Sequence, residues 1–149
     1  MTDAPALPEA PGSFQIDGQW QTGIYRTPFH RAELRARGWR RYRLKEWHYV
    51  SFTTDEWFVA LGLVNLGYVG NLFAYAVDRV QNSSAVEYGT MSPIGRALQI
   101  APSSTNGETR WATRNASVSV RPRNGWDLEL DIPLGSERLR GHGLSLIHI

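Results

Sequence analysis

Glu46 and His48 are the residues of this sequence whose types and spacing come nearest to acid–base chemistry. They are two positions apart, so in a β-strand both side chains point to the same face, where a carboxylate and an imidazole can exchange a proton. Histidines in such positions are more often structural, and the sequence places no nucleophile beside them. We therefore name Glu46 and His48 as candidates only, and whether the protein is an enzyme stays open.

Other chemical motifs are missing from the sequence. It contains no cysteine, which excludes disulfides, thiolate catalysis and zinc sites built on cysteine. It has no glycine-rich phosphate loop and no nucleophile elbow, and His30 and His142 show no metal-ligand spacing. The acids Asp127, Glu129 and Asp131 alternate regularly, which is typical of a solvated strand face. We expect no metal ion and no cofactor.

The stretch RARGWRRYRLKEWHYVSF, Arg35 to Phe52, is rich in both basic and aromatic residues. Such a segment could bind phosphates while its aromatic rings stack on bases. The formal net charge of the chain is only +2, however, and the one basic concentration, eight of the sixteen Lys and Arg residues, is confined to residues 26–45. We therefore expect no nucleic-acid partner and interpret the stretch as a basic loop that leads into a strand.

That strand is predicted over residues 43–52, where aromatic and β-branched residues are frequent. Alternation divides it into two faces, one with Arg43, Lys45, Trp47, Tyr49 and Ser51, the other with Leu44, Glu46, His48, Val50 and Phe52.

The uncharged run from Trp57 to Val77 is long enough to cross a bilayer as a helix. Its glycines and asparagines are costly inside lipid, and Gly67 offers a turn. Two apolar strands, at about Trp57–Leu66 and Tyr68–Val80, therefore fit better than a transmembrane helix.

The rest of the chain predicts antiparallel β-structure with one short helix. Thr27, Pro28 and Gly38 have the types expected at the start and end of a helix over residues 27–38. Residues 81–106 predict a long connection with one short strand near residues 97–100. Residues 116–132 predict a hairpin with a three-residue loop, which sets Val120 against Leu128 and makes one face apolar.

The two ends of the chain are set apart from a single domain at residues 14–143. Residues 1–13 are rich in Pro and Ala and predict a disordered leader. They lack the features of a secretory signal, so we expect a cytoplasmic protein. The last residues, LSLIHI at 144–149, resemble the translated transposase end used in sequencing libraries. We therefore expect the domain to be truncated and the chain to be an N-terminal fragment.

Several of these segments are similar to the DUF2804 family. The similarity is carried by RLKEWHYVSF followed by ALGLVNLGYVGNLFAYAVDR, with FHRAEL upstream and MSPIG downstream. Its most specific parts lie at residues 43–49 and 66–70, and family members tend to have Asp in place of Asn65. The resemblance implies an all-β domain, an incomplete lipocalin-like β-barrel or strongly curved sheet, related to hydroxyneurosporene-synthase-like and AttH-like proteins. It also implies a second half of the same protein as a partner.

Such relatives act on or carry hydrophobic small molecules without an obvious cofactor. We therefore expect a protein that binds a hydrophobic or amphipathic small molecule, or alternatively a cofactor-independent hydratase, isomerase or cyclase with Glu46, His48 or Tyr68 as its acid–base group. The ligand-binding candidates are Arg43, Lys45, Trp47, Tyr49, Asn65 and Tyr68. The face that carries Trp47 could point into a barrel or lie outside against another domain.

Overall fold

A computed structural model describes residues 6–31, 38–81, 86–103, 106–123 and 125–145 of the chain. These residues form an all-β structure, mainly antiparallel, with one short 3-10 helix. In chain order the elements are β1 Gln15–Ile16, β2 Gln19–Trp20, η1 Gly38–Tyr42, β3 Glu46–Thr53, β4 Trp57–Asn65, β5 Val69–Asp78, β6 Val86–Pro93, β7 Leu98–Gln99, β8 Thr109–Ala112, β9 Ser117–Pro122, β10 Trp126–Leu134 and β11 Glu137–Ser145.

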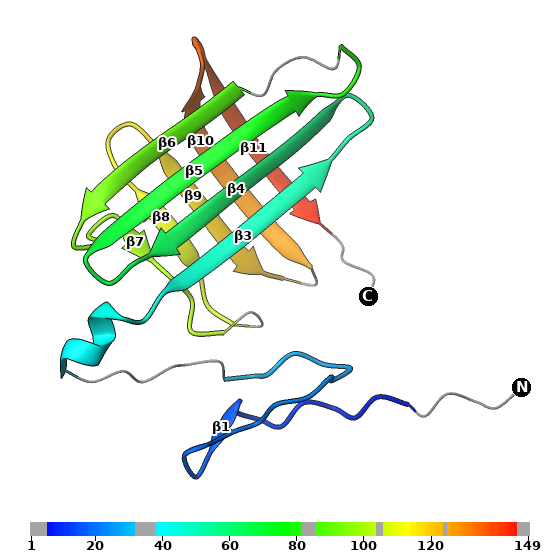
Figure 1. Ribbon diagram of the computed structural model, residues 1–149. Helices are drawn as coiled ribbons and strands as arrows, with labels where there is room; N and C mark the ends of the chain where they lie inside the picture. Colours follow the sequence, from blue (N-terminus) through cyan, green and yellow to red (C-terminus); the bar gives the residue numbers. More distant parts are fainter. Residues whose placement is uncertain (1–5, 32–37, 82–85, 104–105, 124, 146–149) are drawn as a thin grey trace, which may run out of the picture.

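Two antiparallel sheets make up the body of the protein (Figure 1). The first has four strands in the order β3-β4-β5-β6, and the second has five in the order β11-β10-β9-β8-β7. In Figure 1 the four-stranded sheet lies in front of the five-stranded one, and the strands of the two sheets run across each other. Within the described residues no strand pairing joins the sheets. The all-β prediction is confirmed, and the sheets form an open sandwich rather than a closed barrel.

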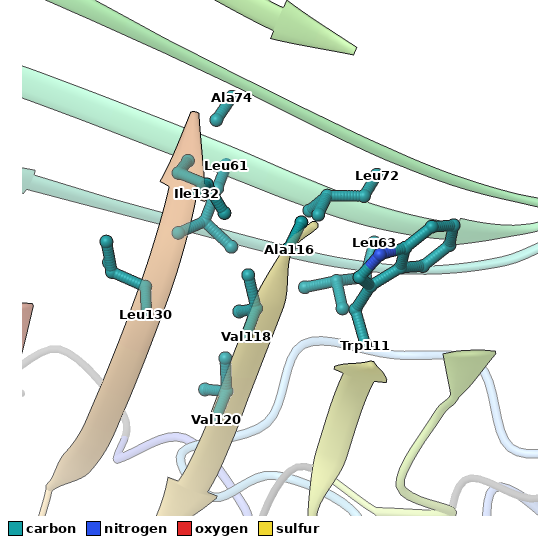
Figure 2. Packing of buried hydrophobic residues seen from close by; sticks show 10 residues of the cluster. All are labelled: Leu61, Leu63, Leu72, Ala74, Trp111, Ala116, Val118, Val120, Leu130 and Ile132. Atoms are coloured by element: carbon teal, nitrogen blue, oxygen red, sulfur yellow. The ribbon is translucent and has the colours of Figure 1, made fainter. Parts of the chain in front are cut away.

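The core lies between the two sheets (Figure 2). The central strands of each sheet direct alternate side chains into this core, because alternate residues of a strand point to opposite faces. The buried cluster consists of Leu61, Leu63, Leu72 and Ala74 from the first sheet and Trp111, Ala116, Val118, Val120, Leu130 and Ile132 from the second. Burying a Leu, Val or Ile side chain contributes about 1.5–3 kcal/mol, so this cluster is the main source of stability.

The apolar run at residues 57–77 forms β4 and β5, which pair antiparallel. Gly67 takes a left-handed φ of 85° in the turn between them. The two-strand prediction is confirmed, and the alternative of a transmembrane helix is wrong. In the described part of the chain there is also no helix with the length and apolarity to cross a membrane.

The predicted hairpin register is confirmed by β9 and β10. Val120 pairs with Leu128, and Arg121 pairs with Asp127. The last pair before the loop is Pro122 with Trp126, which leaves the expected three-residue loop. Gly125 closes it with a φ of 126°, a conformation that glycine adopts without strain.

The short helix lies further along the chain than the sequence indicates. Residues 28–31 are not helical. The hydroxyl of Thr27, the expected cap, accepts a hydrogen bond from Ala10 N at 2.9 Å. Residues 32–37 lie outside the described part, and η1 follows with Gly38 at a left-handed φ of 61°.

Five strands were not predicted, namely β1, β2, β6, β8 and β11. The segment interpreted as a long connection contains β6, an edge strand that pairs with β5. β11 pairs with β10 along its whole length, so residues 144 and 145 are part of a strand. Residues 146–149 lie outside the described part.

Candidate functional site

The two faces of β3 point to different environments. Glu46, His48, Val50 and Phe52 are half-buried, while Trp47, Tyr49, Ser51 and Thr53 alternate with them and are exposed. Val50 and Phe52 pack against the core, which fixes this register. The Trp47 side of the strand therefore lies on the outer surface of the sandwich, away from the second sheet.

The outer surface of the four-stranded sheet carries large apolar side chains from β3, β5 and β6. We call Trp47, Tyr49, Phe73, Tyr75 and Met91 the aromatic face. Trp47 is 76% exposed, Met91 70% and Tyr49 49%. The strand register aligns four residues in one row that crosses all four strands, namely Trp47, Val64, Asn71 and Met91.

Phe73 lies over Gly62 in the next row of this face. A Cβ atom placed on Gly62 would come within 2.3 Å of Phe73 Cζ, so only glycine leaves room for the ring. The hydroxyls of Tyr49 and Tyr75 are 3.2 Å apart on the same face. This hydrogen bond raises the pKa of Tyr75. The rings are thus tied down across the sheet and form a flat, partly exposed surface.

Lys45 and Tyr68 meet at one end of this surface, where β4 turns into β5. Lys45 Nζ donates to Leu66 O at 2.9 Å and lies 4.7 Å from the centroid of the Tyr68 ring. Arg43 lies over Trp39 of η1, at 5.8 Å from the ring. The positive charges of the candidate set are therefore placed beside aromatic rings, in a cation–π arrangement.

Asn65 is separated from the other binding candidates. Its Oδ1 accepts a hydrogen bond from Gly67 N at 2.9 Å, and its Nδ2 donates to Glu46 Oε2 at 3.2 Å. Both contacts lie at the β4–β5 turn. Asn65 thus stabilises the turn and, paired with Glu46, belongs to the opposite side of the sheet from Trp47.

His48 points between the two sheets and contacts Thr109. His48 Nδ1 and Thr109 Oγ1 are 2.8 Å apart, and the same oxygen accepts a hydrogen bond from Ala101 N at 3.0 Å. The Thr109 hydroxyl is thus free to donate its own proton to Nδ1 of a neutral imidazole. Burial lowers the pKa of His48, which favours that neutral form. The ring also packs edge-on against Trp126 at 5.2 Å.

Glu46 and His48 do not form the acid–base pair that their spacing allows. Within the described residues, the hydrogen bonds of the Glu46 carboxylate and the His48 ring go to Asn65 and Thr109, respectively. The arrangement is the one expected of a structural histidine in a sheet interface.

A polar depression of about 450 Å³ lies on the outer surface of the five-stranded sheet. Sequence analysis did not identify it. Glu108 Oε1 is its best-connected atom, because it accepts from Ser119 Oγ at 2.7 Å and from Arg121 Nη2 at 3.0 Å. These contacts, that of Ser119 first, lower the pKa of Glu108.

The acids of β10 differ in exposure, although their alternation predicts one solvated face. Asp131 is partly exposed, and its bonds with Arg138 and Arg140 lower its pKa. Asp127 is almost completely buried, with 5% of its side chain exposed. The register of β10 and β11 also brings His142 opposite Glu129. This neighbour was not identified from the sequence, because the strand β11 was not predicted.

Comparison with known proteins gives one match. A family model described as a domain of unknown function, DUF2804, matches residues 11–145 and confirms the resemblance drawn from the motifs of β3 and of the β4–β5 turn. No curated protein and no solved structure shows a significant match.

Proposed function

The chain belongs to the DUF2804 family, and from this premise we propose that it binds a hydrophobic or amphipathic small molecule on the aromatic face. The observation that carries the proposal is the exposure of Trp47, Tyr49 and Met91 on the same outer surface of the four-stranded sheet. Single exposed apolar residues are ordinary, but a contiguous group of large ones marks an interaction site.

The shape of the aromatic face favours a flat or extended apolar group. Phe73 lies across Gly62 rather than standing away from the sheet, and Tyr49 and Tyr75 hold each other through their hydroxyls. Rings held in this way offer apolar area with little loss of side-chain entropy on binding.

Lys45 supports an anionic or polar head group on the ligand. Its ammonium group donates one good hydrogen bond, to Leu66 O, and has a longer contact of 3.5 Å with Tyr42 O. An ammonium has three donor hydrogens, so a carboxylate or sulfonate can be accommodated. Tyr68 beside it, 57% exposed, would cover the adjoining part of the ligand.

The proposal can be tested with 1-anilinonaphthalene-8-sulfonate, a flat anionic amphiphile whose fluorescence rises on binding. We expect saturable 1:1 binding to the full chain, and a Kd about tenfold weaker in Trp47→Ala, since truncating a central aromatic residue costs about 1–2 kcal/mol. Trp20→Ala removes an exposed tryptophan from β2 and serves as the matched control. Equal weakening in both variants, with unchanged near-UV circular dichroism, would contradict the proposal.

The alternative function is that of a cofactor-independent hydratase, isomerase or cyclase. Its candidate groups are Glu46, His48 and Tyr68, and the contacts of Glu46 with Asn65 and of His48 with Thr109 favour binding over catalysis. Turnover of a captured ligand that is lost in His48→Gln while binding remains would establish the alternative. A second half of the same protein is a competing occupant of the aromatic face, and loss of probe binding in a longer chain would identify it.

A further inference from the structure

Three side chains with metal-binding atoms meet on the outer surface of the five-stranded sheet. Asp127 and Glu129 project from β10 and His142 from β11, and one ligand atom of each lies within 4.8 Å of the others. We propose that Asp127, Glu129 and His142 form a binding site for a divalent transition-metal ion such as Zn²⁺. The site lies on the other sheet from the aromatic face and is independent of the function proposed above.

Asp127 provides the strongest reason for a ligand at this place. Only 5% of its side chain is exposed, and Oδ1 accepts no hydrogen bond from the described residues. The other oxygen, Oδ2, faces two arginines, with Arg123 Nε at 3.7 Å and Arg121 Nη1 at 3.9 Å. A buried carboxylate oxygen that accepts no hydrogen bond is costly. The arginines thus hold one oxygen and leave the other directed at the cluster.

His142 provides the second ligand. Its Nε2 lies 3.1 Å from Asp127 Oδ1. Since that oxygen accepts no hydrogen bond, the two atoms are neighbours without being oriented as donor and acceptor. Atoms that bind one zinc ion at 2.0–2.2 Å are themselves about 3.0–3.5 Å apart. The separation of Nε2 and Oδ1 therefore fits two ligands of a common ion.

Glu129 can complete the set by a side-chain rotation. Its carboxylate is 49% exposed and contacts Arg121 Nη1 at 3.4 Å. A surface ion pair of this kind is worth about 0–1 kcal/mol, so exchanging it for a metal ligand is inexpensive. Nitrogen from histidine with carboxylate oxygens suits Zn²⁺, Mn²⁺ or Co²⁺, whereas Mg²⁺ and Ca²⁺ prefer oxygen ligands alone.

The positive charges of Arg121 and Arg123 oppose the binding of a cation, but their side chains do not occupy the site. Arg121 contacts Glu108 Oε1 at 3.0 Å, so part of its charge is already balanced by that carboxylate. The carboxylates of Asp127 and Glu129 balance the remaining positive charge. The ion pairs of Arg121 and Arg123 with Asp127 Oδ2 would orient this ligand as outer-shell partners do in known metal sites.

The test uses the full chain freed of metal with a chelator and titrated with Zn²⁺, and with Co²⁺ for its visible spectrum. We expect one ion per chain by native mass spectrometry and a Kd at least about tenfold weaker in His142→Gln and in Glu129→Gln. His30→Gln and Glu137→Gln remove an exposed residue of the same type elsewhere and should leave the Kd unchanged.

Two results would overturn the proposal. One is the absence of saturable binding at millimolar Zn²⁺. The other is binding that weakens as much in the control variants as in His142→Gln and Glu129→Gln. Because these four residues are exposed, their replacement should leave the fold intact, which unchanged near-UV circular dichroism would verify.

Discussion

Gly62 of β4 lies directly beneath the ring of Phe73 of β5, so closely that a Cβ at position 62 would come within 2.3 Å of the ring. The two residues are paired in the sheet, and the glycine lets the aromatic side chain lie across the strand beside it. The flatness of the aromatic face depends on this pair.

Replacing Gly62 with alanine should therefore displace Phe73. We expect Gly62→Ala to lower the free energy of unfolding by about 1–3 kcal/mol, the usual effect of overpacking, and to weaken binding of the amphiphile. Urea denaturation measures the first effect. Gly89 is the matched control on β6, because no described atom lies within 4 Å of a Cβ built there. Equal effects of Gly62→Ala and Gly89→Ala would show that the position of the Phe73 ring does not depend on Gly62.

The stability of the protein should fall as the pH drops below about 6.5, the ordinary pKa of histidine, because of His48. Burial lowers the pKa of His48 below its ordinary value of about 6.5 in the folded state, so the unfolded chain binds the proton more tightly. The stabilising contribution is thus present above the unfolded pKa and is lost as the pH falls, by at most about 1.4 kcal/mol per pH unit. Urea denaturation at several pH values should show this slope in the wild type and in His30→Gln. If the same dependence of stability on pH persisted in His48→Gln, another titratable group would be its cause.

Glu108→Gln should destabilise the five-stranded sheet. The substitution weakens the hydrogen bonds from Ser119 and Arg121 to Oε1, and we expect a loss of about 1 kcal/mol at neutral pH. Because the pKa of Glu108 is lowered from 4.5, the difference from wild type should shrink as the pH falls below that value. Thermal unfolding at pH 7 and pH 3.5 measures it. A difference that stays constant with pH would exclude the carboxylate charge as its cause.

Asn65→Asp tests the two hydrogen bonds that Asn65 makes at the β4–β5 turn. Asp can still accept the hydrogen bond from Gly67 N, so the turn should be preserved. The substitution removes the donor to Glu46 Oε2 and places two carboxylates together. We expect a loss of about 1 kcal/mol at pH 7 that is relieved by the second substitution Glu46→Gln, as a double-mutant cycle would show. Additive effects would mean that the carboxylates do not interact.

The strand pairs of the fold could be predicted where alternation was clear. Val118, Val120, Leu128 and Leu130 fix the register of β9 and β10 because a shift by one residue would bury charges. β6 was missed because Gly89 and Pro93 interrupt its apolar pattern, and its pairing with β5 compensates for its weak propensity.

The environment of a strand face was harder to predict than the strand. Both faces of β3 carry large apolar groups, Trp47 and Tyr49 on one and Val50 and Phe52 on the other. Which of the two pairs is buried depends on the side of β3 against which the five-stranded sheet packs. His142 joins Asp127 through a second pairing, and sequence spacing alone shows no relation between residues on different strands.

Binding of 1-anilinonaphthalene-8-sulfonate to the full chain and to Phe73→Ala tests the central claim most directly. Phe73 lies in the middle of the aromatic face and outside the buried core cluster, so the variant should remain folded. We predict saturable binding to the wild type and a Kd about tenfold weaker in Phe73→Ala, with Trp20→Ala unchanged. The same affinity in all three proteins would contradict the assignment of the ligand to this face.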